Sequence, residues 1–585
     1  MITSKPSGKN LFSWSGLALA ALLSTLLATA TEAQTAGAAE TNGAMIAVAN
    51  PLAAEAGAQI LREGGSAIDA AIAAQMVLGL VEPQSSGIGG GAFLLHYDPA
   101  GNKIQAFDGR ERAPLAATAD QFLKADGQPM SFYEAVVGGL SVGVPGVPRL
   151  LERVYSEQGQ LPWARLFEPA IKLAEAGFEI SPRLAALIAR DKYLATFADT
   201  RAYFYNPDGS PKTAGTLLKN PAYAQTLREI AARGADAFYQ GEIAQAIVAA
   251  QAKAPVNPGR MVLDDLSAYQ AKEREILCRP YKGASQIYRI CGMPPPTSGG
   301  IATLQIMGIL EGFSLSQYAP MDPQAIHLAT QASRLAFADR NALVADSDFV
   351  TVPVRQLLNS EYLSSRAEAI GPQDMGKAEP GPVNQRTAIP PDQVEPPSTT
   401  HLVVVDAQGR VVSMTSSVEN AFGSRLMVKG FLLNNQLTDF SFRPEVAGKP
   451  VANRVEPGKR PRSSMSPTLV FNQKGGFQLA VGSPGGSRII GYVVKTLIGV
   501  LDWNLSAQAA VNLPNFTNRN GATDLEAERG LEDLAKALEE RGHEVKLRAL
   551  NSGLQAVRAR PAANGGVRLD GGADRRREGR VIALP

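Results

Sequence analysis

The sequence predicts an α+β protein built as a layered sandwich, with helices packed against the faces of β-sheets. Helical periodicity prevails over residues 51–82, much of 120–270 and 322–346. Strand-rich sequence begins at residue 401, and a long apolar helix is expected at about 487–503. Because helical segments stand on both sides of these strands in the chain, a layered arrangement explains how each apolar face is buried. The order of the strands does not follow from these patterns.

The N-terminal elements begin with a helix, a turn at Gly64-Gly65 and a second helix from Ser66, all within residues 51–82. A glycine string at 87–91 follows, and residues 92–97 have the pattern of a buried strand. A phosphate-binding loop would need a lysine, a hydroxyl and a following helix, which are missing here. We therefore interpret the glycines as a close approach between backbones. Further helices are expected at 148–155, 163–176 and 221–233.

A proline-rich segment separates the helical part from the strand-rich part. Residues 371–397 contain seven prolines and almost no apolar periodicity, which predicts a long exposed loop. The loop leads directly into Ser398-Thr399-Thr400-His401. Strands are then expected at 401–405 and 410–416, joined by a turn at 406–409, and at 430–433, 468–471 and 477–481.

Charge and cysteine usage narrow the class of protein. The 585 residues carry 57 Lys and Arg against 55 Asp and Glu, without a long run of either sign, so no nucleic-acid groove is expected. The short cluster 575–577 of three arginines is expected to be solvated. Cys278 and Cys291 flank a predicted hairpin, and either a disulfide or two buried thiols fits their spacing. The four histidines are too scattered for a zinc site, so neither a metal nor an organic cofactor is expected.

The N-terminus has the pattern of a secretory signal peptide over residues 1–36. Lys5 and Lys9 precede an apolar run at 17–30, and small residues follow it. An uncleaved anchor is the alternative, but the run is shorter than a membrane span requires, and no later segment reaches that length. The sequence thus predicts export to the periplasm or the medium, with no stable membrane span.

Thr399 stands at the end of an exposed loop, which places a hydroxyl at a possible new chain terminus, although by itself it equally fits an ordinary strand residue. A threonine hydroxyl attacks weakly near neutral pH, whereas a free α-amine, with a pKa of about 7.7 to 8.0, can serve as its general base. In the uncut chain this nitrogen is an amide. The Ser398–Thr399 bond must therefore break first, by attack of the Thr399 hydroxyl on the Ser398 carbonyl.

Together with five other strings, the sequence at 398–401 resembles the γ-glutamyltranspeptidase family of N-terminal-nucleophile hydrolases. The strings follow the family order across residues 47–583, and they are Asp108-Gly-Arg-Glu-Arg-Ala-Pro114, Met293-Pro-Pro-Pro-Thr-Ser-Gly-Gly300, Leu433-Asn-Asn-Gln436, Arg462-Ser-Ser-Met-Ser-Pro467 and Gly482-Ser-Pro-Gly-Gly-Ser-Arg488. The resemblance implies a four-layer αββα sandwich, autoprocessed into a large subunit, 37–398, and a small subunit, 399–585, that stay associated.

The resemblance also implies roles around the nucleophile. Thr399 would attack, Ser417 would support its hydroxyl in place of the family's Thr, and Thr400 would contact the nucleophile as the second processing-site Thr. Gly485 and Gly486, before an apolar helix, would hold the oxyanion with backbone N–H groups.

A second set of residues would bind the substrate. Arg110 suits a carboxylate and is implied to bind the α-carboxylate, with hydroxyl donors from Ser463 and Ser464. Asp439 and Gln436 would bind the α-ammonium. Well-known members of the family have Asn where this chain has Glu419, which adds a potential carboxylate on the same wall, where Glu419 and Asp439 are expected to repel each other in the empty site. The loop between Asp439 and Ser463 is short and lacks Tyr and Trp, so a lid over the site is not expected.

The predicted reaction is attack of Thr399 on a γ-glutamyl amide such as glutathione, followed by transfer to water, an amino acid or a peptide. The partners are thus a small-molecule donor and acceptor. One alternative is a glutaryl or cephalosporin-type acylase on the same scaffold, which would not need an α-ammonium pocket. Another is an unprocessed exported binding protein, which the hydroxyls at 399 and 417 disfavour.

Overall fold

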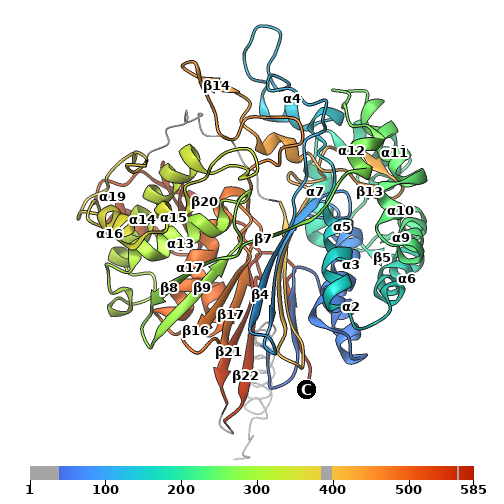
Figure 1. Ribbon diagram of the computed structural model, residues 1–585. Coiled ribbons are helices and arrows are strands. Elements are labelled where there is room, and N and C mark those ends of the chain that lie inside the picture. The colour runs from blue at the N-terminus through green and yellow to red at the C-terminus, as the bar shows by residue number, and fades with distance from the viewer. Residues whose placement is uncertain (1–38, 384–397, 563–564) are drawn as a thin grey trace, which may run out of the picture.

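The computed structural model describes residues 39–383, 398–562 and 565–585, and it shows two central β-sheets covered by helices on both outer sides (Figure 1). This arrangement confirms the predicted α+β sandwich of four layers. The predicted signal peptide lies outside the described residues, as does most of the proline-rich loop, residues 384–397.

The first sheet has seven antiparallel strands in the order β23-β2-β10-β11-β3-β4-β7. Their bounds are β2 Met45–Val48, β3 Gly91–Asp98, β4 Lys103–Gly109, β7 Lys272–Arg274, β10 Thr400–Val405, β11 Val411–Ser417 and β23 Arg580–Ala583. The hairpin predicted at 401–416 is β10 and β11. Both strands are buried throughout, as their near-continuous apolar sequences require.

The second sheet also has seven antiparallel strands, in the order β1-β22-β21-β17-β16-β9-β8. Their bounds are β1 Ala39–Thr41, β8 Leu277–Lys282, β9 Ile287–Gly292, β16 Thr468–Asn472, β17 Phe477–Gly482, β21 Gln555–Pro561 and β22 Val567–Ala573. Cys278 on β8 lies directly opposite Cys291 on β9, and a disulfide joins them. Of the two states left open by the sequence, the structure thus has the bonded one.

Strand alternation decides which layer each side chain enters. On β2, Met45 and Ala47 belong to the core shared by the two sheets, whereas Ile46 and Val48 pack with the helices outside the first sheet. Those helices include α2 Pro51–Arg62, α3 Ala67–Val81, α5 Val147–Gln158, α6 Glu168–Ala176 and α9 Pro221–Arg233. The helices outside the second sheet include α13 Gly299–Leu310, α14 Pro323–Leu343 and α17 Ile489–Leu501.

The helices predicted from periodicity are present at the expected places. The pair at 51–82 is α2 and α3, and Ser66 begins α3 with a capping box in which the Asp69 amide donates to Ser66 Oγ at 3.1 Å. The long apolar helix at 487–503 is a short 3₁₀ turn, Gly486–Arg488, continued by α17. Within the part of the chain that the structure describes, no helix has the length and hydropathy of a membrane span.

Candidate active site

The predicted site residues meet at one end of both sheets, because antiparallel strands alternate in direction. Thr399 stands directly before β10, Ser417 is the last residue of β11, and Arg110 follows β4 directly. In the register, Ser417 pairs with Gly91 at the start of β3. The second sheet brings Ser463 to the same end ahead of β16. The short elements α4 (Phe132–Val136) and β14 (Glu445–Val446) lie at this end in Figure 1.

One pocket collects nine of the twelve residues predicted for catalysis, binding and processing. Its lining consists of Arg110, Thr399, Ser417, Glu419, Gln436, Asp439, Ser463, Ser464 and Gly486, together with Met465 and Ile489. Gly485, Ser398 and Thr400 do not line it. The cavity has a volume of about 30 Å³, which is far below the several hundred Å³ of a typical ligand pocket. A substrate must therefore displace contacts that hold the empty pocket closed.

The nucleophile end of the pocket is a short chain of hydroxyl contacts. Thr399 Oγ1 lies 2.9 Å from Ser417 Oγ, and the Glu419 backbone N–H donates to Ser417 Oγ at 2.9 Å. Ser417 is therefore oriented by its own loop and can exchange a hydrogen bond with Thr399. Thr400 Oγ1 is buried without a hydrogen-bond partner among the described residues. Among the described residues, its hydroxyl therefore makes no hydrogen bond to Thr399.

The glycine string explains how the backbone before β3 can lie so close to the end of β11 at Ser417. A Cβ built on Gly90 would stand 2.1 Å from the Ser417 carbonyl oxygen, a distance that no side chain tolerates. Gly90 therefore admits the backbone of β11 where any other residue would push it away. This is the close backbone approach that the glycines predicted.

Thr399 has a strained backbone. Its φ is 83°, a left-handed value that is a true outlier for a β-branched residue and costs about 1 to 3 kcal/mol. Contacts on both sides hold it there. The Ser398 hydroxyl donates to the Gln84 carbonyl at 2.7 Å, and Arg577 Nη1 donates to the Thr399 carbonyl at 2.8 Å.

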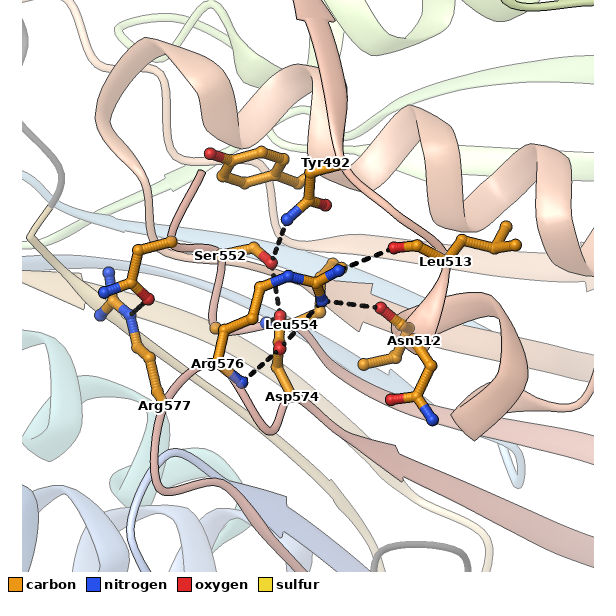
Figure 2. A network of polar contacts seen from close by, with 12 residues as sticks. Tyr492, Asn512, Leu513, Ser552, Leu554, Asp574, Arg576 and Arg577 are labelled. Carbon is orange, nitrogen blue, oxygen red and sulfur yellow. Dashed lines mark hydrogen bonds and ion pairs between the residues drawn. The ribbon is translucent and has the colours of Figure 1, made fainter. Parts of the chain in front are cut away.

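Arg577 was missed by the sequence analysis, and the expectation that cluster 575–577 is solvated is wrong for it. The residue is 5% exposed, and burial lowers the pKa of its guanidinium to about 9. It occupies the turn that crosses from β22 in one sheet to β23 in the other, beside the Asp574 network of Figure 2. Asp574 orients this turn by accepting from the Arg576 amide at 2.9 Å. The only hint in the sequence is an acidic residue, Asp574, three positions before Arg577, and such a spacing is a weak signal.

The start of α17 has the backbone expected for oxyanion binding. Gly485 has a φ of 143° and Gly486 a φ of 58°, and a Cβ on Gly485 would lie 2.6 Å from the Tyr492 ring. Glycine is thus required there for both conformation and space. In the described part of the chain, neither glycine amide donates a hydrogen bond to the protein. Unpaired N–H groups at a helix start favour developing negative charge.

The opposite end of the pocket is an ion-pair cluster. Arg110, 1% exposed, directs Nη2 to the Asp439 carboxylate, and Gln436 Nε2 donates to the same Asp439 oxygen at 2.8 Å. Arg110 Nε donates to the Pro461 carbonyl at 3.1 Å, which fixes the plane of the guanidinium. In the empty pocket, therefore, the expected carboxylate-binding and ammonium-binding residues are paired with each other.

Glu111 is a second residue that the sequence analysis did not single out. It is completely buried behind Arg110, with Oε2 at 3.6 Å from Arg110 Nη1. Neither of its oxygens has a hydrogen-bond partner among the described residues. Burial raises the pKa of this carboxyl to about 8, although the nearby Arg110 opposes the shift. The raised pKa favours the neutral form of Glu111, so this carboxyl competes less with a substrate carboxylate for Arg110.

Glu419 lines the same pocket as Asp439, but the two carboxylates have separate partners. Asn435 Nδ2 donates to Glu419, whereas Asp439 is held by Arg110 and Gln436. The repulsion expected between two unpaired acids in the empty site is thus offset by these contacts. Glu419 also has a left-handed φ of 76°, so its loop is tightly constrained.

The two serines are fixed by different neighbours. Ser463 Oγ accepts from the Met465 amide at 3.1 Å, and Ser464 Oγ accepts from Arg340 Nη2 on α14 at 2.6 Å. Both serines line the pocket from a loop that α14 of the second helical layer supports through Arg340. Among the described residues, no group of three or more His, Cys, Asp or Glu side chains is placed to hold a metal ion.

Comparisons with known proteins identify the family of this chain. The family model for gamma-glutamyltranspeptidase matches residues 53–584. The chain is 38% identical to a glutathione hydrolase proenzyme of Bacillus subtilis, over 81% of this chain and 80% of that protein. It is 34% identical to an acylase ACY 1 proenzyme of a Pseudomonas strain, over 92% and 93% of the two chains. A crystal structure of cephalosporin acylase from Bacillus halodurans superposes with a TM-score of 0.80 and 30% identity, covering 94% of this chain and 97% of that one. The chain belongs to the gamma-glutamyltranspeptidase family.

Proposed function

We propose that this enzyme hydrolyses and transfers γ-glutamyl groups of glutathione and related amides through an ester on Thr399, after cleaving its own Ser398–Thr399 bond. The observation that carries the substrate choice is the ion pair between the buried Arg110 and the partly buried Asp439. A γ-glutamyl group has both an α-carboxylate and an α-ammonium. It can replace this pair by two new pairs, carboxylate with Arg110 and ammonium with Asp439, so that no buried charge is left alone.

The same exchange disfavours the acylase alternative. A glutaryl group supplies the carboxylate but no ammonium, so binding it would take Arg110 from Asp439 without supplying a new cation in its place. Removing one partner of a fully buried pair costs about 3 to 5 kcal/mol, and for Asp439, whose side chain is 14% exposed, the cost should lie toward the lower end of that range. Because an acylase proenzyme is among the relatives, removal of a glutaryl group is the second candidate reaction. The charge balance of the pocket favours the γ-glutamyl substrate.

Self-cleavage is supported by the geometry of Thr399 and by the relatives that are named proenzymes. Attack of Oγ1 on the Ser398 carbonyl forms an ester and frees the Thr399 nitrogen as an amine. Water then hydrolyses the ester. The angle φ at Thr399 is defined by its bond to the Ser398 carbonyl carbon. Cleavage breaks that bond, so the strain of the left-handed φ is released. The products would be residues 37–398 and 399–585, which remain associated because both contribute strands to each sheet.

In turnover, the Thr399 amine takes the proton of Oγ1 as the hydroxyl attacks the γ-carbonyl. Ser417 holds Oγ1, and the N–H groups of Gly485 and Gly486 stabilise the oxyanion. Residues 1–36 would direct export to the periplasm or the medium, where the Cys278–Cys291 disulfide persists. Neither a metal nor an organic cofactor has a part in these steps.

A gel and two chromogenic substrates test the proposal. Purified enzyme should separate into two bands on a denaturing gel, with Thr399 at the N-terminus of the smaller one. It should hydrolyse γ-glutamyl 4-nitroanilide at least about 100-fold more efficiently than glutaryl 4-nitroanilide, which follows from the cost of unpairing Asp439. A small fragment that begins at another residue, or a preference for the glutaryl compound, would contradict it.

A further inference from the structure

Arg340 is a buried cation that contacts the loop carrying Ser463 and Ser464. It stands near the end of α14, in the helical layer outside the second sheet (Figure 1), and it is 4% exposed. Its guanidinium nitrogens donate to three different oxygens, Nη2 to Ser464 Oγ at 2.6 Å, Nε to Ser298 Oγ at 2.9 Å and Nη1 to Asn341 Oδ1 at 2.8 Å. Because these bonds point in different directions, they fix the orientation of the planar guanidinium. No reaction step above uses Arg340.

The contact with Ser298 extends this support to Ser463. Ser298 Oγ accepts from Arg340 and donates its own proton to the Ser463 carbonyl at 2.7 Å, and the Ser298 amide donates to the same carbonyl at 2.8 Å. The Ser463 amide, in turn, donates to the Pro296 carbonyl at 3.1 Å. The backbone of Ser463 is therefore fixed on the segment 296–298, and Arg340 fixes the hydroxyl that joins the two.

The loop at 462–464 is held between two arginines. On one side, the Arg462 carbonyl accepts from Arg110 Nη2 at 3.2 Å. On the other side, Ser464 accepts from Arg340, and Arg462 Nη1 donates to the Arg340 carbonyl at 3.2 Å. Arg110 lines the catalytic pocket, and Arg340 lies behind Ser464, outside the lining. Arg340 therefore acts on a bound substrate through the serines and not by direct contact.

The direction of the hydrogen bond from Arg340 determines what Ser464 offers to the pocket. A serine hydroxyl has one proton and two acceptor lone pairs, and here one lone pair is taken by a guanidinium, which cannot accept. The hydroxyl proton then makes Ser464 a donor, which is the role that a substrate carboxylate needs. A cation that donates to the oxygen also polarises the O–H bond and strengthens its donation. A carboxylate bound by Arg110 and Ser464 would thus be stabilised by two positive charges, one in contact and one relayed through the hydroxyl.

We propose that Arg340 is a positioning residue for recognition of the substrate α-carboxylate. It orients the Ser464 hydroxyl directly and the Ser463 backbone through Ser298, so that both serines meet the carboxylate that Arg110 binds. The inference rests on the proposed function and deepens it, because it adds a specificity-determining residue outside the pocket. If Arg340 only stabilised the end of α14, its loss would lower the activity on every substrate by the same factor.

Two substrates that differ only at the α-carboxylate test this role. The first is γ-glutamyl 4-nitroanilide, and the second is its α-amide, which keeps the ammonium and replaces the carboxylate by a neutral group. In Arg340→Gln, the ratio of kcat/KM for the first substrate to kcat/KM for the second should fall about tenfold, the effect of one hydrogen bond from a charged donor. Arg340→Lys should recover part of this ratio. Ser464→Ala should also lower it, and the double variant Arg340→Gln/Ser464→Ala should lose less than the product of the two single losses, because both changes act through one hydroxyl.

The matched control is Arg355→Gln, which removes an exposed arginine on helix α15 (Val354–Leu357) and should leave the ratio unchanged. An unchanged ratio in Arg340→Gln, with normal cleavage into two fragments, would overturn the positioning role. The proposed function would then still stand, provided that the wild type hydrolyses γ-glutamyl 4-nitroanilide. If the wild type cleaves neither anilide, the proposed function fails and the inference falls with it.

A second pair of variants covers the case in which Arg340→Gln does not accumulate as folded protein. Ser298→Ala removes the bridge from Arg340 to Ser463, and it should lower the ratio about threefold, as expected for one neutral hydrogen bond. Arg340→Lys keeps the charge but cannot make all three contacts, so its ratio should lie below that of the wild type. Wild-type ratios in both variants would overturn the positioning role.

Discussion

The two ends of the catalytic pocket are built in different ways. The nucleophile end consists of neutral hydroxyls and backbone amides at the ends of strands, where Thr399, Ser417 and the two glycines are placed by strand register and by one helix start. The head-group end consists of charged side chains, with Arg110 and Asp439 paired in a small pocket of about 30 Å³. Glu111 lies buried behind them.

The difference teaches what each end contributes. Backbone groups cost little to keep in place and act on charge that develops during the reaction. Buried charges act before the reaction, because they select a ligand that restores their neutrality. Changes at the nucleophile end should therefore stop chemistry, and changes at the head-group end should alter which substrates are accepted.

The largest effect should come from the nucleophile itself. Thr399→Ala should remain a single uncut chain and lose activity by roughly 10⁴-fold or more, because processing and turnover use one hydroxyl. Thr399→Ser, which keeps that hydroxyl, is the control and should be cut, although more slowly. A two-band gel for the alanine variant would exclude Thr399 as the nucleophile of cleavage.

At the head-group end, Arg110→Lys should lower kcat/KM for γ-glutamyl substrates by about 100-fold, because an ammonium cannot reproduce the paired contacts of a planar guanidinium. The variant should still be cleaved into two fragments, since Arg110 does not touch Thr399. Asp439→Asn is the companion variant, and it should reduce the preference for γ-glutamyl over glutaryl anilide. Normal kcat/KM in a correctly processed Arg110→Lys enzyme would remove Arg110 from the substrate site.

Arg577 offers a test within the nucleophile end, since it holds the Thr399 carbonyl without touching the reacting hydroxyl. Arg577→Met should slow self-cleavage by about tenfold, the value of one hydrogen bond from a charged donor. Arg577→Lys should recover part of the rate. Time courses of the precursor band measure this, with Arg575→Gln, an exposed neighbour, as the control. If Met and Lys variants mature at the wild-type rate, the left-handed Thr399 does not depend on Arg577.

Glu419 lies between the two ends of the pocket. Its backbone N–H donates to Ser417 at the nucleophile end, and the residue lines the pocket together with Asp439 of the head-group end. Glu419→Asn should weaken the preference for γ-glutamyl over glutaryl anilide by about threefold, as expected for one partly compensated charge near the ammonium. It should also change the pH profile of kcat/KM more than the maximal rate. Identical profiles and preferences in the two enzymes would show that this carboxylate does not contact substrate.

The smallest effect on activity, but a clear one on stability, should come from Glu111→Gln. The folded protein keeps a proton on Glu111 up to a pKa of about 8, whereas the unfolded chain loses it near pH 4.5. The contribution of this group to stability is therefore full below pH 4.5 and declines as the pH rises to about 8, by roughly 1.4 kcal/mol per unit. Glutamine does not titrate, so the Tm of the variant should fall less than that of wild type between pH 5.5 and 8. The exposed Glu540→Gln is the control, and parallel Tm curves for all three proteins would refute the shift.

The sequence by itself determined the elements and the chemistry-bearing strings. Periodicity located α2, α3, α9 and α14, alternation located β10 and β11, and the proline-rich loop pointed to Thr399. These features are local, since they depend on the burial pattern of neighbouring residues and on turn-forming residues. Most of the site residues could be predicted by resemblance because each of these lies within a short string of neighbouring residues that matches the family.

Only the tertiary structure decided which of these residues meet and in what state. The strand order, the Arg110–Asp439 pair, the burial of Glu111 and the contact from Arg577 to Thr399 all join segments that are distant in the chain or oriented by such segments. Charge and burial are properties of the assembled environment, so Arg577 in an arginine cluster is indistinguishable by sequence from its exposed neighbour Arg575. What separates them is the turn between the two sheets, which places Arg577 in the core beside the nucleophile and Arg575 at the exposed surface.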